Sequence, residues 1–403
     1  MDSEYTVIGA LLKMERIKQN KGQKEVCYGI CVPSYLSKIE HGTVNPDNEI
    51  IKQLYERLGI SYEIDKKVLS EYREGISRYF HLLHYNMDTE EVYAELLEAA
   101  SQLLYSAFAV DWLIIKGIEE EPVLPQIGRL KEAMSAEQKA YYLWLCFKEY
   151  TDSAQRVLDY EKACTIINNS FAMIQLCRAY FYHGDYPAIH RMENRTVAAA
   201  LEEGNTYYLA EYYFFNGSAY ACLDMEEMMI ANYNRSICLL QNTGWKERMP
   251  DLYYNMGASY IALKKYKLGL EYLLKAQELQ KESEFFTIHK LAIAYIRQGK
   301  MEEGRDCLRR IKKLFLDEKA YTELEYLMYE EACMECEKGF LDNPEYMKLL
   351  DKLIKVIEKD SHFGFLYFYK EIIVKAYERQ RKYKKALEFE QKISSIVIKM
   401  NTK

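Results

Sequence analysis

The sequence predicts an all-α protein with a small helical bundle followed by a long array of helical hairpins. The 403 residues include only 18 Gly and 7 Pro, too few for a turn-rich β architecture. Apolar residues recur at helical spacing, and beyond residue 60 a tyrosine-centred pattern repeats at similar intervals. We therefore expect three parts: a bundle in residues 1–62, a connector with the first hairpins in 63–135, and the repeat array in 136–403.

Composition limits the class of protein. An apolar content of 49% is enough to bury more than one sizeable core. The first ten residues lack the basic region and long apolar run of a secretion signal. The most apolar run, residues 103–115, is interrupted by Asp111 and is too short to cross a bilayer. We expect a cytoplasmic protein whose ten cysteines stay reduced.

No pattern in the sequence predicts catalysis or a cofactor. Cys333 and Cys336 have metal-site spacing, but no second pair of ligands lies nearby, so we interpret them as core residues. His81 and His84 lack a third ligand and fit an exposed helix face. There is no glycine-rich phosphate loop, zinc-type His/Glu spacing or nucleophile elbow. We expect no metal, no cofactor and no enzymatic activity.

The bundle begins with two helices. Residues 6–19 have helical periodicity, and residues 23–29 follow a helix stop at Asn20-Lys21-Gly22. We expect the first helix to bury one stripe and to turn its basic residues outward, while the second helix faces inward with Val26 and Cys27. The expected inward stripe is Ile8, Leu11, Leu12 and Ile17, and the expected outward residues are Lys13, Arg16 and Lys18.

Two more helices complete the predicted bundle. Residues 34–41 direct Leu36 and Ile39 to the core and end at Gly42. Asn45-Pro46-Asp47 starts a fourth helix that ends at Gly59. Its periodic apolar residues are Ile50, Ile51, Leu54 and Leu58.

Charge is distributed unevenly along the chain. Residues 1–60 carry eight Lys/Arg and eight Asp/Glu, so the net charge of −7 belongs to residues 61–403. Five basic residues between positions 13 and 24 face a single opposing Glu15, and this cluster is suited to phosphates. They are Lys13, Arg16, Lys18, Lys21 and Lys24.

Two short helices joined by a tight turn, the second with small polar and basic residues outward, suit a reader of the DNA major groove. From this polarity alone, four short helices also fit any small bundle. The run Gln23-Lys24-Glu25-Val26, then Gly29-Ile30-Cys31, residues 36–42 and Pro46 resembles the Xre/Cro-type helix-turn-helix family over residues 6–60.

This resemblance implies a set of DNA contacts. Gln23 would anchor a phosphate, residues of the third helix would approach bases or backbone, and Glu40 would be structural. Pro33 near the start of the recognition helix departs from the usual pattern and puts the base contacts in doubt. The expected DNA-binding residues are Arg16, Gln23, Lys24, Pro33, Ser34, Tyr35, Ser37 and Lys38.

The array is identified by its repeats. Residues 251–281 match the aromatic-x2-Leu-Gly-x2-Tyr, small-x3-large pattern of a tetratricopeptide repeat (TPR). Small residues at Gly257 and Ala276 let paired helices approach closely, and Tyr260 and Tyr266 fill the space toward the next hairpin. Fainter copies end at Tyr180, Tyr220, Tyr295 and Tyr377.

These copies predict about eight hairpins in a right-handed TPR-like α-solenoid. Residues 137–168 and 318–358 fit further helical pairs, and residues 65–118 two or three longer helices. In such a solenoid the first helix of each hairpin lines the inner surface, where amides pair with a peptide backbone and basic groups hold carboxylates. The aromatic residues there are equally suited to packing between repeats. The expected peptide-binding residues are Gln175, Arg178, Tyr182, Glu211, Phe215, Ser218, Tyr254, Asn255, Lys290 and Arg297, with Asn255 and Arg178 first among them.

A helix-turn-helix module followed by TPR hairpins resembles the peptide-responsive RRNPP regulators of Gram-positive bacteria, the group of Rap, Rgg, NprR, PlcR and PrgX. The resemblance implies a quorum-sensing type of transcription regulator. It would be a homodimer on an inverted-repeat site in double-stranded DNA, controlled by a short linear peptide in the concave groove. Two alternatives remain: a Rap-like scaffold that regulates another protein, and a constitutive dimeric repressor.

Overall fold

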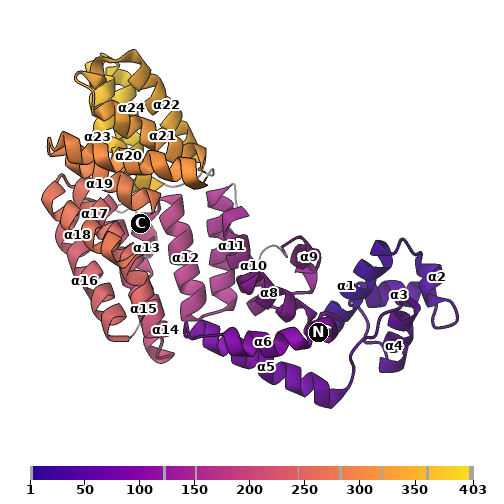
Figure 1. The fold of residues 1–403 in the computed structure, drawn as a ribbon. Coiled ribbons are helices and arrows are strands. Elements are labelled where there is room, and N and C mark those ends of the chain that lie inside the picture. The colour runs from indigo at the N-terminus through magenta and orange to yellow at the C-terminus, as the bar shows by residue number, and fades with distance from the viewer. Residues whose placement is uncertain are drawn as a thin grey trace. The chain divides into compact units, whose positions relative to one another are not determined.

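The computed structural model describes residues 3–120, 124–149, 152–243, 245–280, 284–318, 321–359 and 363–398. Within these ranges the chain is all-α, with 24 α-helices, four short 3-10 helices and no strand (Figure 1). The predicted fold class is confirmed. The chain divides into two compact units: Met1–Tyr150 with Asp159–Ile167, and Thr151–Leu158 with Asn168–Lys403. The further division at residues 62 and 135 stays a prediction.

The four predicted helices of the bundle are present as α1 (Ser3–Lys18), α2 (Gln23–Cys27), α3 (Pro33–Glu40) and α4 (Asn48–Arg57). Leu11, Leu36 and Leu54 are buried as predicted. Ile17 is not, because it is 59% exposed near the end of α1. Helices α1 and α3 cross where a Cβ on Gly9 would lie 1.8 Å from the Ile39 carbonyl oxygen, so the close crossing requires glycine.

The remainder of unit 1 consists of the long helix α5 and several shorter helices around a second core that includes Tyr79, Leu103 and Trp112. Asp65 caps the first of these helices by accepting hydrogen bonds from the backbone N–H groups of Lys67 and Val68. Helix α11 is divided between the two units. The elements are α5 (Lys66–His84), α6 (Glu90–Glu98), α7 (Ala100–Leu104), α8 (Ala109–Glu119), α9 (Leu124–Arg129), η1 (Lys131–Ala133), α10 (Ala136–Leu145), η2 (Cys146–Glu149) and α11 (Ser153–Ile166).

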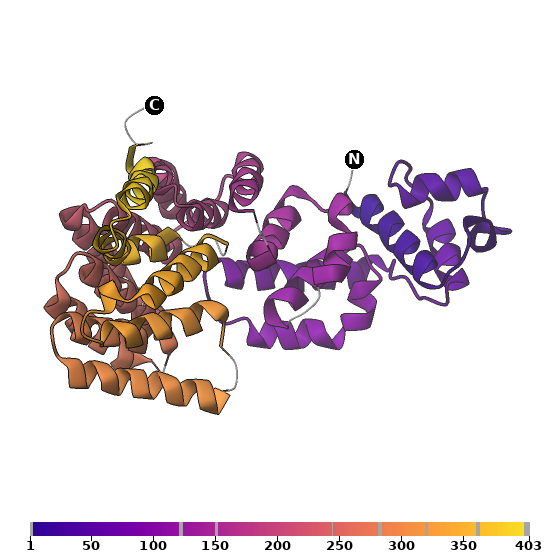
Figure 2. The same cartoon turned by 90° about the horizontal axis from the view of Figure 1, so that it is seen from above.

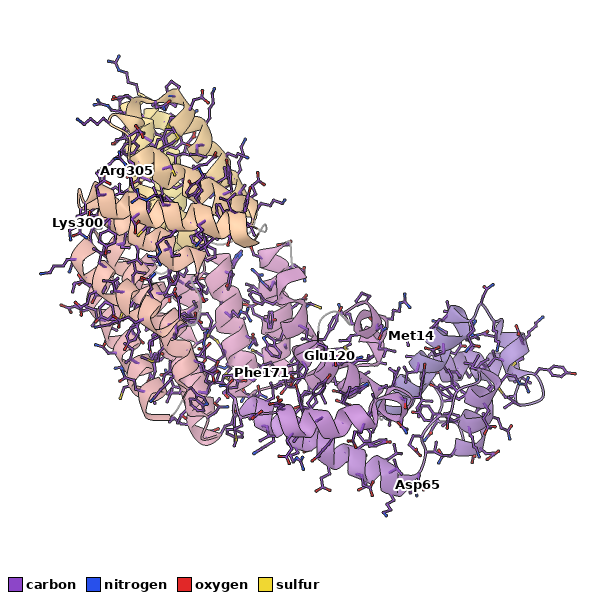
Figure 3. All side chains as sticks on the ribbon, viewed as in Figure 1. Met14, Asp65, Glu120, Phe171, Lys300 and Arg305 are labelled. Carbon is purple, nitrogen blue, oxygen red and sulfur yellow. The ribbon has the colours of Figure 1, made fainter. Side chains whose placement is uncertain are left out.

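Unit 2 is the array of helical hairpins. Helix α12 (Ser170–His183) is followed by two shorter helices, α13 (Tyr186–Arg191) and α14 (Glu193–Glu202). Five two-helix hairpins come next, and side chains fill the spaces between the ribbons (Figure 3). The hairpins are α15 (Thr206–Cys222) with α16 (Glu226–Thr243), α17 (Met249–Ala262) with α18 (Tyr266–Leu279), α19 (Phe285–Arg297) with α20 (Met301–Glu318), α21 (Glu323–Glu335) with α22 (Pro344–Lys359), and α23 (Phe363–Arg379) with α24 (Tyr383–Ile398).

Small residues bring the paired helices close together, as predicted. A Cβ on Gly257 in α17 would lie 2.7 Å from Leu273 Cγ and 3.0 Å from the Gly269 carbonyl oxygen of α18. In the preceding hairpin, a Cβ on Gly217 would lie 2.8 Å from the Tyr233 ring. Any larger side chain at these positions would separate the two helices.

The recurring tyrosine marks the end of α12, α15, α17, α19 and α23, whereas α21 has Glu335 at this position. The residue four positions after it has a left-handed backbone, with φ of 82° at Gly184, 57° at Asp224 and 62° at Lys264. The next backbone N–H donates to the tyrosine carbonyl, for example from Lys265 to Tyr260 at 2.8 Å. This is the Schellman helix end, and it gives successive hairpins equivalent turns.

The last hairpin packs on the first ones. Helix α23 contacts α12 and α17, and α24 contacts α13. Figure 2 shows the yellow C-terminal helix beside the mauve helices at the start of the array. A continuous apolar core runs through the second half of the array, from Ile261 in α17 to Ile393 in α24.

Candidate DNA-binding and ligand-binding surfaces

A buried carboxylate fixes the three helices around the predicted reading surface. Glu40, at the end of α3, is 4% exposed. It accepts hydrogen bonds from Arg16 Nε at 2.6 Å and Arg16 Nη2 at 3.0 Å, and from Gln23 Nε2 at 2.8 Å. The hydrogen bond to Glu40 raises the pKa of Arg16. One side chain therefore ties α3 to both α1 and α2, which supports the structural role implied for Glu40.

This network corrects one expectation and qualifies another. Arg16 was expected to turn outward, but its side chain is only 13% exposed because the buried carboxylate of Glu40 draws it inward. Its Nη1 also donates to the Lys21 carbonyl at 2.9 Å. Gln23, expected at a phosphate, is half-buried and donates to Glu40. Both residues hold the module together in this structure.

The outer side of α3 and the preceding turn are exposed. Lys24, Pro33, Ser34 and Lys38 are exposed, whereas Tyr35 and Ser37 are half-buried. We did not predict two further exposed residues, Tyr28 (78%) and Val32 (62%), which lie on the turn between α2 and α3. Exposed apolar residues beside basic ones are suited to contacts with bases. Gly29 follows Tyr28 directly and has a positive φ. This glycine was the feature of the sequence that could have shown that Tyr28 lies at a turn.

The ten predicted peptide-binding residues all lie on the first helices of their hairpins. Many of their polar groups already have partners within the array. They are distributed over α12 (Gln175, Arg178, Tyr182), α15 (Glu211, Phe215, Ser218), α17 (Tyr254, Asn255) and α19 (Lys290, Arg297).

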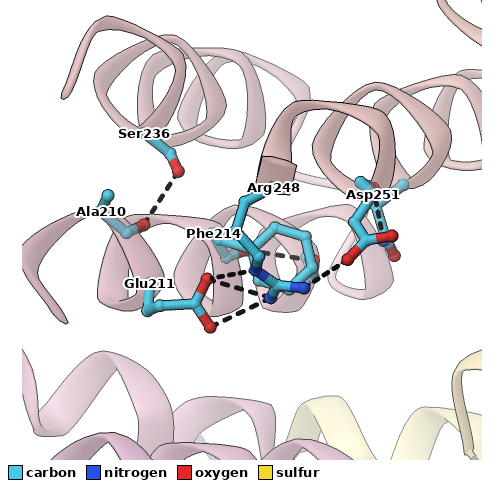
Figure 4. Close-up of polar contacts among 8 residues, drawn as sticks. Ala210, Glu211, Phe214, Ser236, Arg248 and Asp251 are labelled. Atoms are coloured by element: carbon cyan, nitrogen blue, oxygen red, sulfur yellow. Dashed lines mark hydrogen bonds and ion pairs between the residues drawn. The ribbon is translucent and has the colours of Figure 1, made fainter. Parts of the chain in front are cut away.

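Glu211 belongs to the most extensive of these internal contacts (Figure 4). Its carboxylate accepts from Arg248 Nε at 3.0 Å and Nη2 at 3.1 Å. The same guanidinium pairs with Asp251 and lies over the Phe214 ring, 5.6 Å from its centroid. Burial alone would lower the pKa of Arg248, but Glu211, with Tyr207 and Asp251, outweighs burial and raises it. Arg248 was not predicted, because it lies in a short 3-10 helix, η3 (Lys246–Arg248), outside the repeat pattern.

Ser218 and Asn255 are also engaged. Ser218 Oγ lies 3.0 Å from Tyr233 Oη and donates to the Phe214 carbonyl at 3.0 Å. Asn255 Nδ2 donates to the Asp251 carbonyl, four residues earlier in the same helix, at 2.8 Å. The Asn255 amide is part-buried, and this bond uses one of its donors.

Lys290 and Arg297 are covered by the last hairpin. Lys290 is 1% exposed, and its Nζ lies 3.3 Å from the centroid of the Phe368 ring of α23. Burial lowers the pKa of Lys290 well below its ordinary value, and Arg297 adds to this effect. Arg297 donates to Glu335 of α21 at 2.7 and 3.2 Å. Neither residue presents a free basic group on the surface, because aromatic residues distant in sequence cover them.

On α12, Gln175 is 6% exposed, and its Oε1 has no hydrogen-bond partner within the described ranges of the chain. The guanidinium of Arg156 lies 5.7 Å from the centroid of the Tyr182 ring. In the next hairpin, the Phe215 ring lies 5.9 Å from that of Phe181, which links α12 to α15. The aromatic residues here pack between repeats, the alternative role we considered for them.

No group of three or more His, Cys, Asp or Glu residues that could hold a metal is found among the residues that the structure describes. Cys333 and Cys336 are free thiols, both half-buried. Across the described helices, none has the length and apolar character needed to span a membrane.

Comparison with known proteins gives a fold relationship. No protein-family model matches the chain, and no curated protein does. A crystal structure of a Rap protein complexed with competence and sporulation factor matches with a TM-score of 0.61 and 13% identity, covering 82% of this chain and 99% of that one. This likeness establishes the helical-repeat fold.

A structure of Bacillus thuringiensis PlcR with the peptide PapR7 and DNA covers 87% of this chain and 99% of that one. Its identity to this chain is 15% and its TM-score is 0.21, too low to support an argument.

Proposed function

We propose that this protein is a DNA-binding regulator whose helix-turn-helix module reads DNA and whose repeat array responds to a short peptide. The observation that carries the proposal is the exposed basic and polar side of α3, held in place by the buried Glu40 network, in a chain that continues into an array of helical hairpins. A major-groove reader needs both a rigid core and an exposed helix.

On the DNA side, Lys24 and Lys38 would contact phosphates, and Ser34 with the neighbouring Pro33 would reach base edges. Phosphate contacts set affinity and register, and base contacts set sequence preference. Two copies of the chain, as a homodimer, would place two such modules on an inverted repeat. The net charge of −7 on residues 61–403 would repel DNA from the array and confine binding to the module.

On the peptide side, the first helices of the hairpins are the proposed binding surface. The Rap protein of similar fold was solved in complex with competence and sporulation factor, and this supports a peptide as the ligand class. Regulation would be a population shift, because a peptide that prefers one state of the array changes the populations of both. A peptide with equal affinity for both states would have no effect.

Rap-like regulation of another protein is the second candidate. The similarity of fold to a Rap protein is the observation that supports it. In that case the amino-terminal module would be secondary. A constitutive dimeric repressor is the third candidate, and it predicts no effect of any peptide.

The test is fluorescence anisotropy of the purified chain on DNA fragments from its own genomic neighbourhood, at stated salt, with and without synthetic peptides from nearby short reading frames. Lys38→Ala should weaken binding to all fragments and reduce the slope of log K against log salt by about 1. Lys52→Ala, an exposed lysine on α4, is the matched control and should change neither. Absence of saturable DNA binding by the parent chain would refute the DNA-binding role and favour the scaffold.

A further inference from the structure

Helix α23 crosses the equivalent turns of three earlier hairpins. Phe363, Tyr367 and Glu371 are spaced four residues apart on α23, and each contacts the turn after a different helix. A Cβ on Gly184 would lie 3.0 Å from the Phe363 ring, and Glu371 forms an ion pair with Lys264 at 3.1 Å. Between them, Tyr367 donates a hydrogen bond to Asp224. Four residues of helix rise about 6 Å, so one side of α23 contacts the turns in the order in which the hairpins are stacked.

The other side of α23 covers α19. Phe365 stacks on Phe286 with centroids 5.8 Å apart, and Tyr369 Oη lies 3.4 Å from His289 Nε2. Phe368 lies between Phe365 and Tyr369 in sequence. The Nζ atom of Lys290 lies over its ring, 3.3 Å from the centroid. The surface of α19 that the sequence assigned to a ligand is therefore occupied by a segment of the same chain.

This occupation leaves buried polar atoms unsatisfied. Lys290 Nζ and His289 Nδ1 have no hydrogen-bond partner among the described residues, and neither does Oε2 of Glu331 on α21. A buried polar atom without a partner opposes the docking that buries it. The ion pair between Lys264 and Glu371 is partly exposed (61% and 33%) and contributes little. Apolar contacts therefore favour the docking of α23, and the buried polar atoms of Lys290 and His289 oppose it.

We propose that α23, with α24, is a latch that opens without unfolding the rest of unit 2 and, when open, uncovers Lys290 on α19. The uncovered amine would then be available to a carboxylate of a ligand, whereas Arg297 would stay paired with Glu335 of α21. The identity of the ligand rests on the proposed function, but the latch itself does not. The buried Lys290 amine and His289 Nδ1, which have no hydrogen-bond partner among the described residues, oppose the closed state and so favour its opening.

The chain contains a natural reporter for this opening. Cys222, at the end of α15, is 8% exposed, and burial raises the pKa of its thiol to about 12. Cys222 lies two residues before Asp224, which accepts the hydrogen bond from Tyr367 of α23. Cys307, in α20, is 4% exposed and serves as an internal reference. Opening of α23 should uncover the Cys222 thiol and leave the Cys307 thiol protected.

The experiment is native labelling of the full chain with N-ethylmaleimide, with the rate at each cysteine followed by mass spectrometry. Phe368→Ala should raise the labelling rate of Cys222 at least tenfold relative to Cys307. Lys290→Met removes the unpartnered amine and keeps an unbranched apolar side chain, so it should lower that rate severalfold.

Two phenol substitutions on the last hairpin provide a matched pair. Tyr367→Phe removes the bond to the α15–α16 turn and should raise Cys222 labelling. Tyr383→Phe changes a phenol at the start of α24 that is 63% exposed and should leave it unchanged. The latch is refuted if Phe368→Ala leaves Cys222 labelling within twofold of the parent, or if Cys222 and Cys307 become reactive together. The measurement uses neither DNA nor peptide, so failure of the latch and failure of the proposed function are separate results.

Discussion

Glu40 is the side chain on which the packing of the amino-terminal bundle converges, because it joins α1, α2 and α3 through Arg16 and Gln23. Glu40→Ala would leave the Arg16 guanidinium half-buried and without its carboxylate. Removing one member of a buried pair costs about 3 kcal/mol or more. We expect a loss of that order in the hydrogen-exchange protection of α1 and α3 in the full chain.

The control for Glu40→Ala is the exposed pair of Lys52 and Glu56, 3.9 Å apart on α4, with side chains 51% and 56% exposed. Lys52→Met should change the protection by less than about 0.5 kcal/mol. Equal effects of the two substitutions would mean that the Glu40 network does not hold the module together.

Asp111 on α8 makes the stability of unit 1 depend on pH. Burial raises the pKa of its carboxyl to about 6 from 3.8, although Gln138 Nε2 donates to it at 2.9 Å. Between pH 3.8 and about pH 6, the Asp111 carboxyl is therefore protonated in the folded state and ionised in the unfolded chain. The stability from this proton is complete below pH 3.8 and is lost as the pH rises to about 6.

Asp111→Asn keeps the acceptor for Gln138 and removes this titration. The shift in pKa corresponds to about 3 kcal/mol at pH 7, so the variant should be more stable than the parent at pH 7 and about equal to it at pH 4. Thermal unfolding at the two pH values measures the difference. A difference between the two proteins that is the same at both pH values would contradict the assignment to Asp111.

At the scale of elements, the hairpins depend on glycines where paired helices meet. A Cβ on Gly257 would be 2.7 Å from Leu273 Cγ and 3.0 Å from a backbone oxygen that cannot easily move. Gly257→Ala should therefore destabilise the α17–α18 hairpin by about 1–3 kcal/mol, measured as increased hydrogen exchange in both helices. Gly22→Ala is the control, because no atom lies within 4 Å of its Cβ position. A neutral Gly257→Ala would show that the hairpin is packed more loosely.

The sequence predicted elements well because helices are encoded locally. The bundle helices begin and end within a few residues of the structure, and the tyrosine repeat marks turns with the same left-handed backbone, as at Asp224 and Lys264. The partners of the predicted site residues were not predictable. Arg248 lies outside the repeat, and Phe368 lies 78 residues after Lys290. Periodicity identifies the inner face of a helix but not the distant segment that covers it.

At the scale of the whole molecule, a neutral amino-terminal bundle is joined to an acidic remainder of the chain. Residues 1–60 have balanced charge, whereas residues 61–403 carry −7. On the proposed DNA-binding role, contacts with phosphates come from a few exposed basic groups, among them Lys24 and Lys38. Because the salt dependence of binding grows with the number of phosphates contacted, the affinity for DNA should be moderate and its salt dependence shallow.

Two substitutions that move the latch in opposite directions test whether the array controls the module. Lys290→Met should hold α23 closed and Phe368→Ala should open it. Coupling between sites is reciprocal and typically amounts to five-fold or more in affinity. We therefore expect the two variants to bind a DNA fragment selected with the parent chain with dissociation constants shifted about five-fold in opposite directions, measured by anisotropy at one salt concentration. Since neither residue belongs to the amino-terminal bundle, such a shift would have to pass through the array. Identical DNA affinities, with the thiol labelling altered as expected, would mean that the latch moves without affecting DNA, and would favour the protein-binding scaffold or the constitutive repressor.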